Sequence, residues 1–446
     1  MSSWFERTGT LGRIRRFLRD RAPGAFMVGG FLRDRTLGRE TRDLDLVVPE
    51  DGLSLARELA GHLGGRFVLL DEEREVARIV LRDEGATYRV DISRRQGESL
   101  EADLALRDFT INAIAADLDL NIIDPLGGRK DLAERRLRAI SEAAFRQDPL
   151  RLLRGIRLAG ELRVEVEAQT ERWMRRDAGL IISSAPERVQ DEWSKIMALK
   201  DSAPSLHYLH RLGLLVALVP ELKEGVEHPL ATVAALERIL STLEEGPLIG
   251  YLSQHTAGER DRLVLLKYVA LFHHIGQGEG YPPSEGVDRS PLGALMRRLR
   301  FSSLEVRLAG EVAAALPQAW SLSDGEPSLL ALHRFFRQAK GGGIEALLLS
   351  LADHLATLSG DESLEAWQER LRNVRSIWSC FFEERERIFP PPLIKGDDLL
   401  REFGLEPGPL IGNLLEVIGE AQVAGEVRTR EEALQLAGKL VAKGHD

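Results

Sequence analysis

The sequence predicts an α+β protein: an N-terminal head with a mixed β-sheet and helices, followed by helices alone. Short apolar runs separated by glycine turns, which are typical of strands, occupy the chain up to Ile92. From Phe145 onward, apolar residues recur at the spacing of helices instead. With 446 residues, the chain has room for roughly two to four domains and a large buried core.

Composition indicates a soluble protein of a reducing compartment. Hydrophobic residues make up 43% of the chain and charged residues 29%, as in soluble globular proteins. The single cysteine, Cys380, excludes an internal disulfide and a Cys-based zinc cluster, which favours the cytoplasm. We expect neither a signal peptide nor a membrane helix, because no apolar run approaches ~18 residues. A net charge of −10 does not exclude an RNA partner, because RNA affinity depends on local basic surfaces.

The head opens on a strand, a glycine turn and a helix. The apolar run Ala25 to Val28 predicts a buried strand, and Gly29 and Gly30 let the backbone turn sharply. Phe31 to Leu37 then has helical spacing, with Gly38 as its C-terminal stop. Backbone amides exposed at such a turn form a ready cradle for a phosphate.

A second strand follows at once and carries Asp43 and Asp45. Side chains two positions apart on a strand face the same side, with Cα atoms roughly 6.5–7 Å apart. Two carboxylates held in this way repel each other unless a cation lies between them. A pair of Mg²⁺ ions, as in polymerases, is the usual reason for the arrangement. Asp-x-Asp also occurs in ordinary loops, so the metal site is a prediction that the structure must support.

The rest of the head has one more helix and three more strands. The expected elements are a helix over 52–62 and strands over 66–70, 76–81 and 87–92. Asp91, at the end of the last strand, is the natural third carboxylate beside the pair. A solvated aspartate at a strand end is the alternative. The Asp-Pro and Gly-Gly turns within residues 122–132 predict a structural closure of the sheet.

These motifs resemble the head of the nucleotidyltransferase superfamily. The form Gly-Gly-x-x-Arg-Asp-x-x-x-Gly, followed by Asp-Leu-Asp, resembles that of class II tRNA nucleotidyltransferases and bacterial poly(A) polymerases. The resemblance implies that Gly29, Gly30, Arg33 and Asp34 hold the triphosphate region and brace the carboxylate strand. It extends over nearly the whole chain, with its most specific motifs in residues 24–192.

A second motif, Leu-Ala-Leu-Arg-Asp-Phe-Thr-Ile-Asn-Ala, covers residues 104–113. It resembles the family's Arg-Arg-Asp-Phe-Thr-x-Asn-Ala motif, which contacts the ribose. Leu106 stands where the first arginine usually is, so only Arg107, Asp108 and Asn112 carry over. The missing arginine puts one triphosphate or RNA contact in doubt.

A third motif begins the helical part. Asp148 and Arg151 are three positions apart, hence on one helical face, although Asp148 as a helix cap before the following proline is the alternative. The stretch resembles the family's Glu-Asp-x-x-Arg motif, with Gln147 in place of the glutamate. The resemblance implies that this Asp and Arg form an amino-acid template for the base of the nucleotide. Arg154 and Arg157 of the same helix are also expected at the nucleotide.

Ser184 opens the next helix and is expected to form a capping box with Glu187. The same stretch resembles the family's Glu-Arg-x-x-x-Glu motif through Glu187, Arg188 and Glu192. In the family this motif braces the template helix, so these residues are expected to support it.

Beyond about residue 222 the chain stays helical. His228, the pair His273 and His274, and Asp353 resemble a degenerate metal-phosphohydrolase (HD-type) domain. In the intact pattern an aspartate follows the second histidine. A histidine can bind a transition metal, but it cannot supply the bridging carboxylate of a two-metal site. We therefore expect a body that holds RNA and has no hydrolase activity.

The expected division of the chain has four parts. They are a catalytic head (1–144), a helical neck that selects nucleotides and binds RNA (145–222), a degenerate HD-like body (223–377) and a tRNA-binding tail (378–446). In the tail, a run of three prolines precedes two short helices joined by a Gly/Pro turn. A helix N-terminus after such a turn can hold an RNA phosphate.

The predicted function is template-independent transfer of nucleotides to the 3′ end of tRNA that lacks its CCA end. Asp43 and Asp45 are expected to bind two Mg²⁺ ions, and nucleoside triphosphates are the expected substrates. Three activities share this framework: adding CC from CTP, adding all of CCA from CTP and ATP, or adding A residues. A different class, an RNA-binding or HD-type hydrolytic protein with an inactive transferase head, is the remaining alternative.

One stretch bears on the choice among the three activities. Only 11 residues, Ile92 to Ala102, separate Asp91 from Asp103. Family members that add all of CCA have a longer flexible loop here, whereas CC-adding members resemble this chain. We therefore expect CC addition, with a separate A-adding enzyme in the same pathway. No pattern in the sequence indicates an oligomeric state.

Overall fold

The computed structural model describes residues 9–83, 85–243, 245–256, 260–275, 290–358 and 363–443. The chain divides into two compact units. Unit 1 comprises Met1–Ile196 with Tyr208–Leu218, and unit 2 comprises Met197–His207 with Val219–Asp446. Every site residue predicted in the head and neck belongs to unit 1. Within the described part of the chain, no helix is both long and apolar enough to span a membrane.

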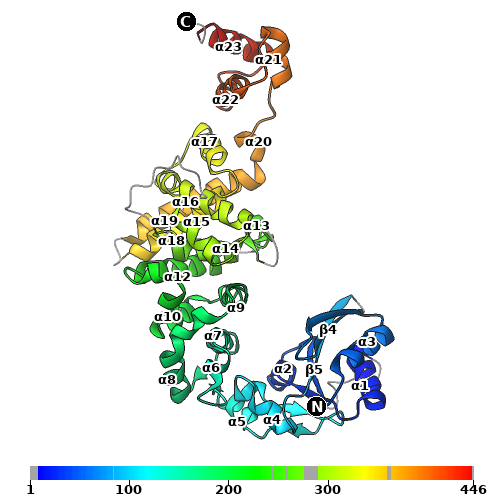
Figure 1. The fold of residues 1–446 in the computed structure, drawn as a ribbon. Coiled ribbons are helices and arrows are strands. Elements are labelled where there is room, and N and C mark those ends of the chain that lie inside the picture. Colours follow the sequence, from blue (N-terminus) through cyan, green and yellow to red (C-terminus); the bar gives the residue numbers. More distant parts are fainter. Residues whose placement is uncertain are drawn as a thin grey trace. The chain divides into compact units, whose positions relative to one another are not determined.

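Unit 1 is built on a seven-stranded mixed sheet in the order β3-β4-β5-β2-β1-β6-β7. Figure 1 labels β4 and β5 of this sheet. β2 and β5 are parallel, and every other neighbouring pair in this sheet is antiparallel. The strands are β1 (Phe26–Val28), β2 (Asp43–Val48), β3 (Arg66–Asp71), β4 (Val76–Asp83), β5 (Ala86–Arg94), β6 (Ala115–Ala116) and β7 (Ile122–Ile123). The predicted fold class, a mixed sheet followed by helices, is confirmed.

Helices cover both faces of this sheet. α3 (Gly52–Leu63) contacts β3, β4 and β5, and α1 (Thr10–Arg21) packs on α3. On the other face, the leucines of α4 (Leu100–Ala105) pack with Val28 and Val47. Val47 is two and four positions from the aspartates of β2, so its side chain shares their face. α4 therefore covers part of the face that carries the carboxylates.

The remaining helices of unit 1 are α2 (Gly30–Thr36), between β1 and β2, and, after the sheet, α5 (Gly128–Ala133), α6 (Ala144–Gln147), α7 (Arg151–Leu162), α8 (Ala168–Asp177), α9 (Pro186–Met197) and α11 (Leu214–Leu218). α10 (Ala203–Arg211) begins in unit 2 and ends in unit 1. A 3-10 turn covers Thr110–Asn112, and two short parallel strands pair β8 (Arg136–Leu137) with β9 (Glu165–Val166). Because α9 ends at Met197, it links the two units along the chain.

In the described part of unit 2, the regular secondary structure is helical. Its helices are α12 (Glu227–Ser241), α13 (Pro247–Leu252), α14 (Arg262–Phe272), α15 (Pro291–Arg298), α16 (Ser303–Ser323), α17 (Leu329–Ala339), α18 (Gly343–Thr357), α19 (Ser363–Glu383), α20 (Arg385–Ile388), α21 (Gly396–Phe403), α22 (Pro409–Val423) and α23 (Arg430–Lys443). Helix α18 is buried on all sides from Gly343 to Asp353 and packs on α12, α14 and α16. A helix that is apolar all round belongs at the centre of a domain, and α18 occupies that position.

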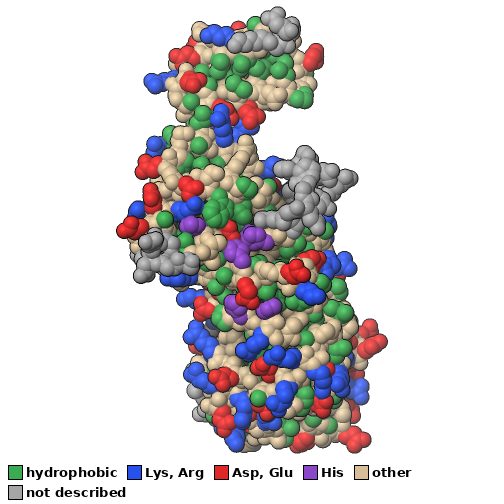
Figure 2. Space-filling model, turned by 90° about the vertical axis from the view of Figure 1, so that its left-hand side faces the viewer, with side chains coloured by type: hydrophobic (Ala, Val, Ile, Leu, Met, Phe, Trp, Pro, Cys, Tyr) green, Lys and Arg blue, Asp and Glu red, His purple; other side chains and the backbone are tan. Residues whose placement is uncertain are grey.

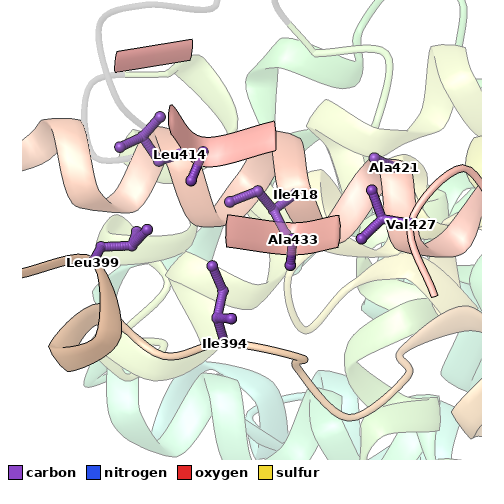
Figure 3. Packing of buried hydrophobic residues seen from close by; sticks show 8 residues of the cluster. Ile394, Leu399, Leu414, Ile418, Ala421, Val427 and Ala433 are labelled. Carbon is purple, nitrogen blue, oxygen red and sulfur yellow. The ribbon is translucent and has the colours of Figure 1, made fainter. Parts of the chain in front are cut away.

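The last three helices have a small core of their own. Figure 3 shows apolar side chains from α21, α22, α23 and the preceding segment converging on one another. The cluster consists of Ile394, Leu399, Leu414, Ile418, Ala421, Val427, Ala433 and Ala437. The two short helices expected after the prolines are α21 and α22, and the turn between them contains Gly404, Pro407 and Gly408. α23 follows them and adds Ala433 and Ala437 to the core.

Candidate active site

Three aspartates meet on two adjacent strands of unit 1. Over its first four residues β2 alternates between more accessible and buried positions, so Asp43 and Asp45 lie on one face while Leu44 and Leu46 point into the core. The parallel register places Asp45 directly opposite Asp91 of β5. Neighbouring strands lie about 4.8 Å apart, so the structure brings the third predicted carboxylate beside the pair.

The charge on Asp45 is poorly compensated within the protein. Burial, together with the charges of Asp91 and Asp43, raises the pKa of Asp45 to about 6, against the opposing effect of Arg107 and Arg33. Carboxylate oxygens from adjacent strands are the ligands that a hard divalent cation prefers. The residues present therefore fit Mg²⁺.

Two arginines that the sequence reading did not single out contact the other two aspartates. Arg78 of β4 donates from Nε and Nη2 to the two oxygens of Asp91, at 2.8 Å each. Arg89 of β5 lies 3.6 Å from Asp43 at the surface. The signal for Arg78 was in the sequence, because the tight β4–β5 hairpin fixes a register that pairs Arg78 with Asp91.

The glycine turn passes very close to the acidic cluster. Gly29 has a φ of +72°, a backbone conformation that residues with a Cβ rarely adopt. A Cβ at this position would lie 3.1 Å from Asp45 Oδ2 and 3.2 Å from Arg107 Nη1. Gly29 is therefore required both for the turn and for the close approach of the backbone to Asp45. Gly30 follows as the first residue of α2.

A chain of charged hydrogen bonds connects α2 to α7. Arg33 is buried, donates to both oxygens of Asp34 at 2.9 and 3.0 Å, and donates to Asn112 Oδ1 at 2.7 Å. Asn112 in turn donates to Asp108 at 3.0 Å, and Arg154 of α7 donates to the other oxygen of Asp108 at 3.2 Å. Burial alone would raise the pKa of Asp108, but Arg154, Asn112 and a backbone amide outweigh it and lower the pKa. Residues of three predicted motifs thus form one network.

The prediction that Asp148 and Arg151 share one face of a helix is wrong. α6 ends at Gln147, Asp148 has an extended backbone (φ −146°, ψ 99°), and α7 begins at Arg151. The physical reason is Pro149, because the residue before a proline is disfavoured in the α conformation. Asp148 Oδ1 accepts from the backbone amide of Leu150 at 3.2 Å, which resembles the helix-cap alternative.

Both side chains of this pair nevertheless have defined partners. Arg188 of α9 donates to the other oxygen of Asp148 at 3.1 Å. Arg151 donates to the backbone carbonyls of Leu106 at 2.7 Å and Arg107 at 3.2 Å. Arg151 is thereby held against the motif that contains Arg107 and Asp108. The two residues flank the start of α7 from different sides of the Pro149 break.

The supporting residues brace α7 against α9. Glu192 is buried and accepts from Arg157 of α7, which also donates to Glu161 at 2.6 Å. The pair with Glu192 joins α7 to α9, the pair with Glu161 lies within α7, and a nucleotide contact for Arg157 stays a prediction. Glu187 lies in the first turn of α9. The predicted capping box is wrong, because the hydroxyl of Ser184 is buried without a hydrogen-bond partner.

Asp103 is a further residue that sequence reasoning did not assign. It is 7% exposed, accepts from the backbone amide of Gln96 at 2.8 Å and accepts from Arg107 at 3.3 Å. Ser99 caps α4 by accepting from the amide of Ala102 at 3.2 Å. Because Asp103 and Arg107 are four positions apart, their ion pair could have been found from helical spacing.

A mixed sheet with three clustered aspartates behind a glycine turn is the arrangement of a nucleotidyl-transfer enzyme. Comparison with known families agrees. The poly A polymerase head domain family matches residues 25–138. A family described as "probable RNA and SrmB-binding site of polymerase A" matches residues 163–225, and one described as "tRNA nucleotidyltransferase domain 2 putative" matches residues 391–437.

Curated relatives match nearly the full length. The chain is 34% identical to a CC-adding tRNA nucleotidyltransferase of Geobacter sulfurreducens, over 93% of this chain and 92% of the relative. It is 32% identical to an A-adding tRNA nucleotidyltransferase of Deinococcus radiodurans, over 92% and 94%. The chain therefore belongs to the tRNA nucleotidyltransferase family, as predicted. A solved CCA-adding enzyme in complex with CTP shares its fold, with a TM-score of 0.71 at 24% identity over 98% of this chain and 96% of that one.

Proposed function

We propose that this enzyme adds two cytidines from CTP to the 3′ end of tRNA that lacks its CCA end, and then stops. Relatives named as CC-adding support the proposal, including the Geobacter sulfurreducens protein. A structure of similar fold, a Thermotoga maritima CCA-adding enzyme in complex with tRNA, supports the RNA substrate (TM-score 0.67). The A-adding relative is nearly as similar, so similarity alone does not decide among the three activities.

The observation that carries the proposal is that the connection between β5 and α4 is short and is held by a hydrogen bond and by close packing. β5 continues to Arg94 and α4 begins at Leu100, which leaves residues 95–99 outside regular structure. The connection is held at Gln96 by Asp103, and a Cβ on Gly97 would lie 2.9 Å from the Cβ of Ala102. A connection this short and this closely packed cannot act as the flexible loop that would let a pocket switch from CTP to ATP.

The proposed chemistry assigns the metal to the acidic cluster. Asp43 and Asp45 would hold two Mg²⁺ ions, with Asp91 as their neighbour. When bound, Mg²⁺ lowers the pKa of the RNA 3′-hydroxyl and stabilises the departing pyrophosphate. The amides after Gly29 would face the triphosphate, and Arg107 would balance charge beside Asp45.

Selection of the base is assigned to the start of α7. We propose that Asp148 accepts from the amino group of cytosine while Arg151 donates to its ring nitrogen and carbonyl. The backbone carbonyls that hold the Arg151 guanidinium support this role, because they fix its orientation. The network from Arg33 to Arg154 would hold the ribose-side residues Asp108 and Asn112 in place. The matches at 163–225 and 391–437 support RNA contacts in the neck and tail.

The test is incubation with end-labelled tRNA lacking CCA, with CTP alone, ATP alone and both, followed by separation at single-nucleotide resolution. We expect two cytidines with CTP, none with ATP, and no third addition with both. Addition of a terminal A with both nucleotides would establish the full CCA activity. Addition of A only to tRNA that already ends in CC would establish the A-adding activity. The CC-adding outcome requires a separate A-adding enzyme in the same cell.

A further inference from the structure

We propose that unit 2 holds a single transition-metal ion, of the zinc class, between His228, His273, His274 and Asp353. This site goes beyond the proposed function, which uses only the carboxylates of unit 1. The four residues come from three separate parts of the unit: His228 from α12, His273 and His274 from the turn directly after α14, and Asp353 from α18.

The ligand atoms of these four residues converge on one point. Asp353 Oδ1 lies 2.7 Å from His228 Nε2, 3.0 Å from His273 Nε2 and 3.7 Å from His274 Nε2. All four ligand atoms lie within 4.8 Å of one another. A tetrahedral zinc ion with arms of about 2.0–2.1 Å separates its ligands by roughly 3.3–3.4 Å. The observed spacings bracket this value, so small side-chain shifts suffice for coordination.

The orientation of His273 favours an ion over a plain hydrogen-bond network. Its Nδ1 lies 2.8 Å from the backbone carbonyl oxygen of Ala270, which can only accept, so Nδ1 carries the hydrogen. In the neutral ring, Nε2 then directs a lone pair at the carboxylate of Asp353, which is repulsive unless a cation lies between them. An Nδ1–H donated to a backbone carbonyl is also the usual way in which a metal-binding histidine is oriented.

The donor set decides which metal fits. Three imidazoles and one carboxylate suit zinc, nickel, copper or iron rather than Mg²⁺. Because Asp353 is the one carboxylate among them, the set is suited to one ion and lacks the second carboxylate that would bridge two. Histidine side chains reach the surface on the face shown in Figure 2. His228 and His274 are 30% and 43% exposed, so an ion can enter from solvent, whereas His273 is buried.

The experiment measures metal content and uses the full-length protein without a polyhistidine tag. The chain is stripped with a chelator, incubated with Zn²⁺, passed over a desalting column and analysed for zinc. We expect about one zinc ion per chain. A parallel titration with Co²⁺ should give the intense visible absorption of a tetrahedral site.

Matched variants separate this site from other histidines and from unit 1. His274→Ala and Asp353→Asn should each lose the zinc and the Co²⁺ spectrum. His207→Ala, an exposed histidine of the same unit, should keep both. Asp43→Asn with Asp45→Asn should also keep both. Retention of zinc by His274→Ala with Asp353→Asn, loss of zinc on removing the unit 1 aspartates, or absence of bound zinc in the unaltered protein would overturn the proposal. Circular dichroism verifies that each variant is folded.

Discussion

Unit 1 and unit 2 each gather charged side chains around one partly buried aspartate, with opposite results. Burial and neighbouring carboxylates raise the pKa of Asp45 to about 6. Burial would likewise raise the pKa of Asp353, but the three imidazoles that face it, His273, His274 and His228, outweigh burial and hold the pKa far below its ordinary value. An all-oxygen cluster selects a hard cation, and a nitrogen-rich cluster selects a softer one. The partners of an aspartate, more than its burial, therefore decide what it can bind.

The largest expected effect is on the aspartate cluster of unit 1. Asp45→Ala should reduce nucleotide incorporation on the order of 10³-fold or more, because the variant lacks a predicted metal ligand. The fold should survive, since the change also removes electrostatic repulsion from Asp91. Incorporation of labelled CTP in Mg²⁺ measures the first effect, and thermal unfolding the second. Zinc content of unit 2 should be unchanged. Substantial Mg²⁺-dependent incorporation by this variant would refute the metal assignment.

The second prediction concerns how the raised pKa of Asp45 makes the stability of the protein depend on pH. The pKa of Asp45 is raised from 3.8 to about 6, so the protonated form is favoured in the folded state. Its contribution to stability is present below about pH 4 and is lost as the pH rises through about 6. Asp45→Asn should therefore stabilise the metal-free protein by about 2–3 kcal/mol at pH 7.5, and by little near pH 4.

Urea denaturation in a chelator, at both pH values, measures this difference. Saturating Mg²⁺ at pH 7.5 should reverse it by stabilising only the unaltered protein. Asp353→Asn serves as the comparison. Because the pKa of Asp353 is lowered in the folded state, its carboxylate stabilises the fold at every pH above its ordinary pKa of 3.8. This variant should therefore lose stability at neutral pH. An equal effect of Asp45→Asn at both pH values would contradict the prediction.

The third prediction uses two glycines with nearly the same φ. Gly29 has a φ of +72° and Gly38 a φ of +73°, but only at Gly29 would a Cβ meet other atoms within 4 Å. Gly38→Ala should lose about 1 kcal/mol of stability from its positive φ. Gly29→Ala should lose more, because a φ of +72° with a ψ of −140° is a combination that essentially only glycine adopts. Gly29→Ala alone should lose nucleotide incorporation, by roughly tenfold or more, because its Cβ displaces Asp45 and Arg107. Equal activities of the two variants would show that the close approach is unimportant.

The smallest expected effect is a null one in unit 2. The His274 imidazole cannot bridge two metal ions, so we expect no phosphatase or phosphodiesterase activity from this cluster. Hydrolysis of a 2′,3′-cyclic phosphate with added nickel or manganese is the measurement. Stimulated hydrolysis that disappears in His273→Ala would show that the cluster is catalytic after all.

The features that could be predicted from the sequence are those that depend on the local pattern of residues. The strand, glycine turn and helix around Gly29, and the shared face of Asp43 and Asp45, follow from periods of two and 3.6 residues. The break at Pro149 was also readable, because the proline restricts Asp148, yet the Asp148 to Arg151 spacing suggested a continuous helix.

Other features could not be read from local pattern because they depend on tertiary contacts. The partners of Arg33 and Arg151 lie 79 and 45 residues away in the chain. The capping box expected at Ser184 was wrong for the same reason, because burial of the Ser184 hydroxyl depends on packing that no short motif encodes.

The network from α2 to α7 has a consequence for building chimeras. Asp108 is 5% exposed, and its partner Arg154 lies beyond the boundary expected at residue 144. A head cut at that boundary would retain a buried carboxylate without its guanidinium, which is costly. Exchange of heads between relatives should therefore carry α7 along, with a junction after Leu162. The segment that must be exchanged as one piece is therefore longer than the sheet on which the head is built.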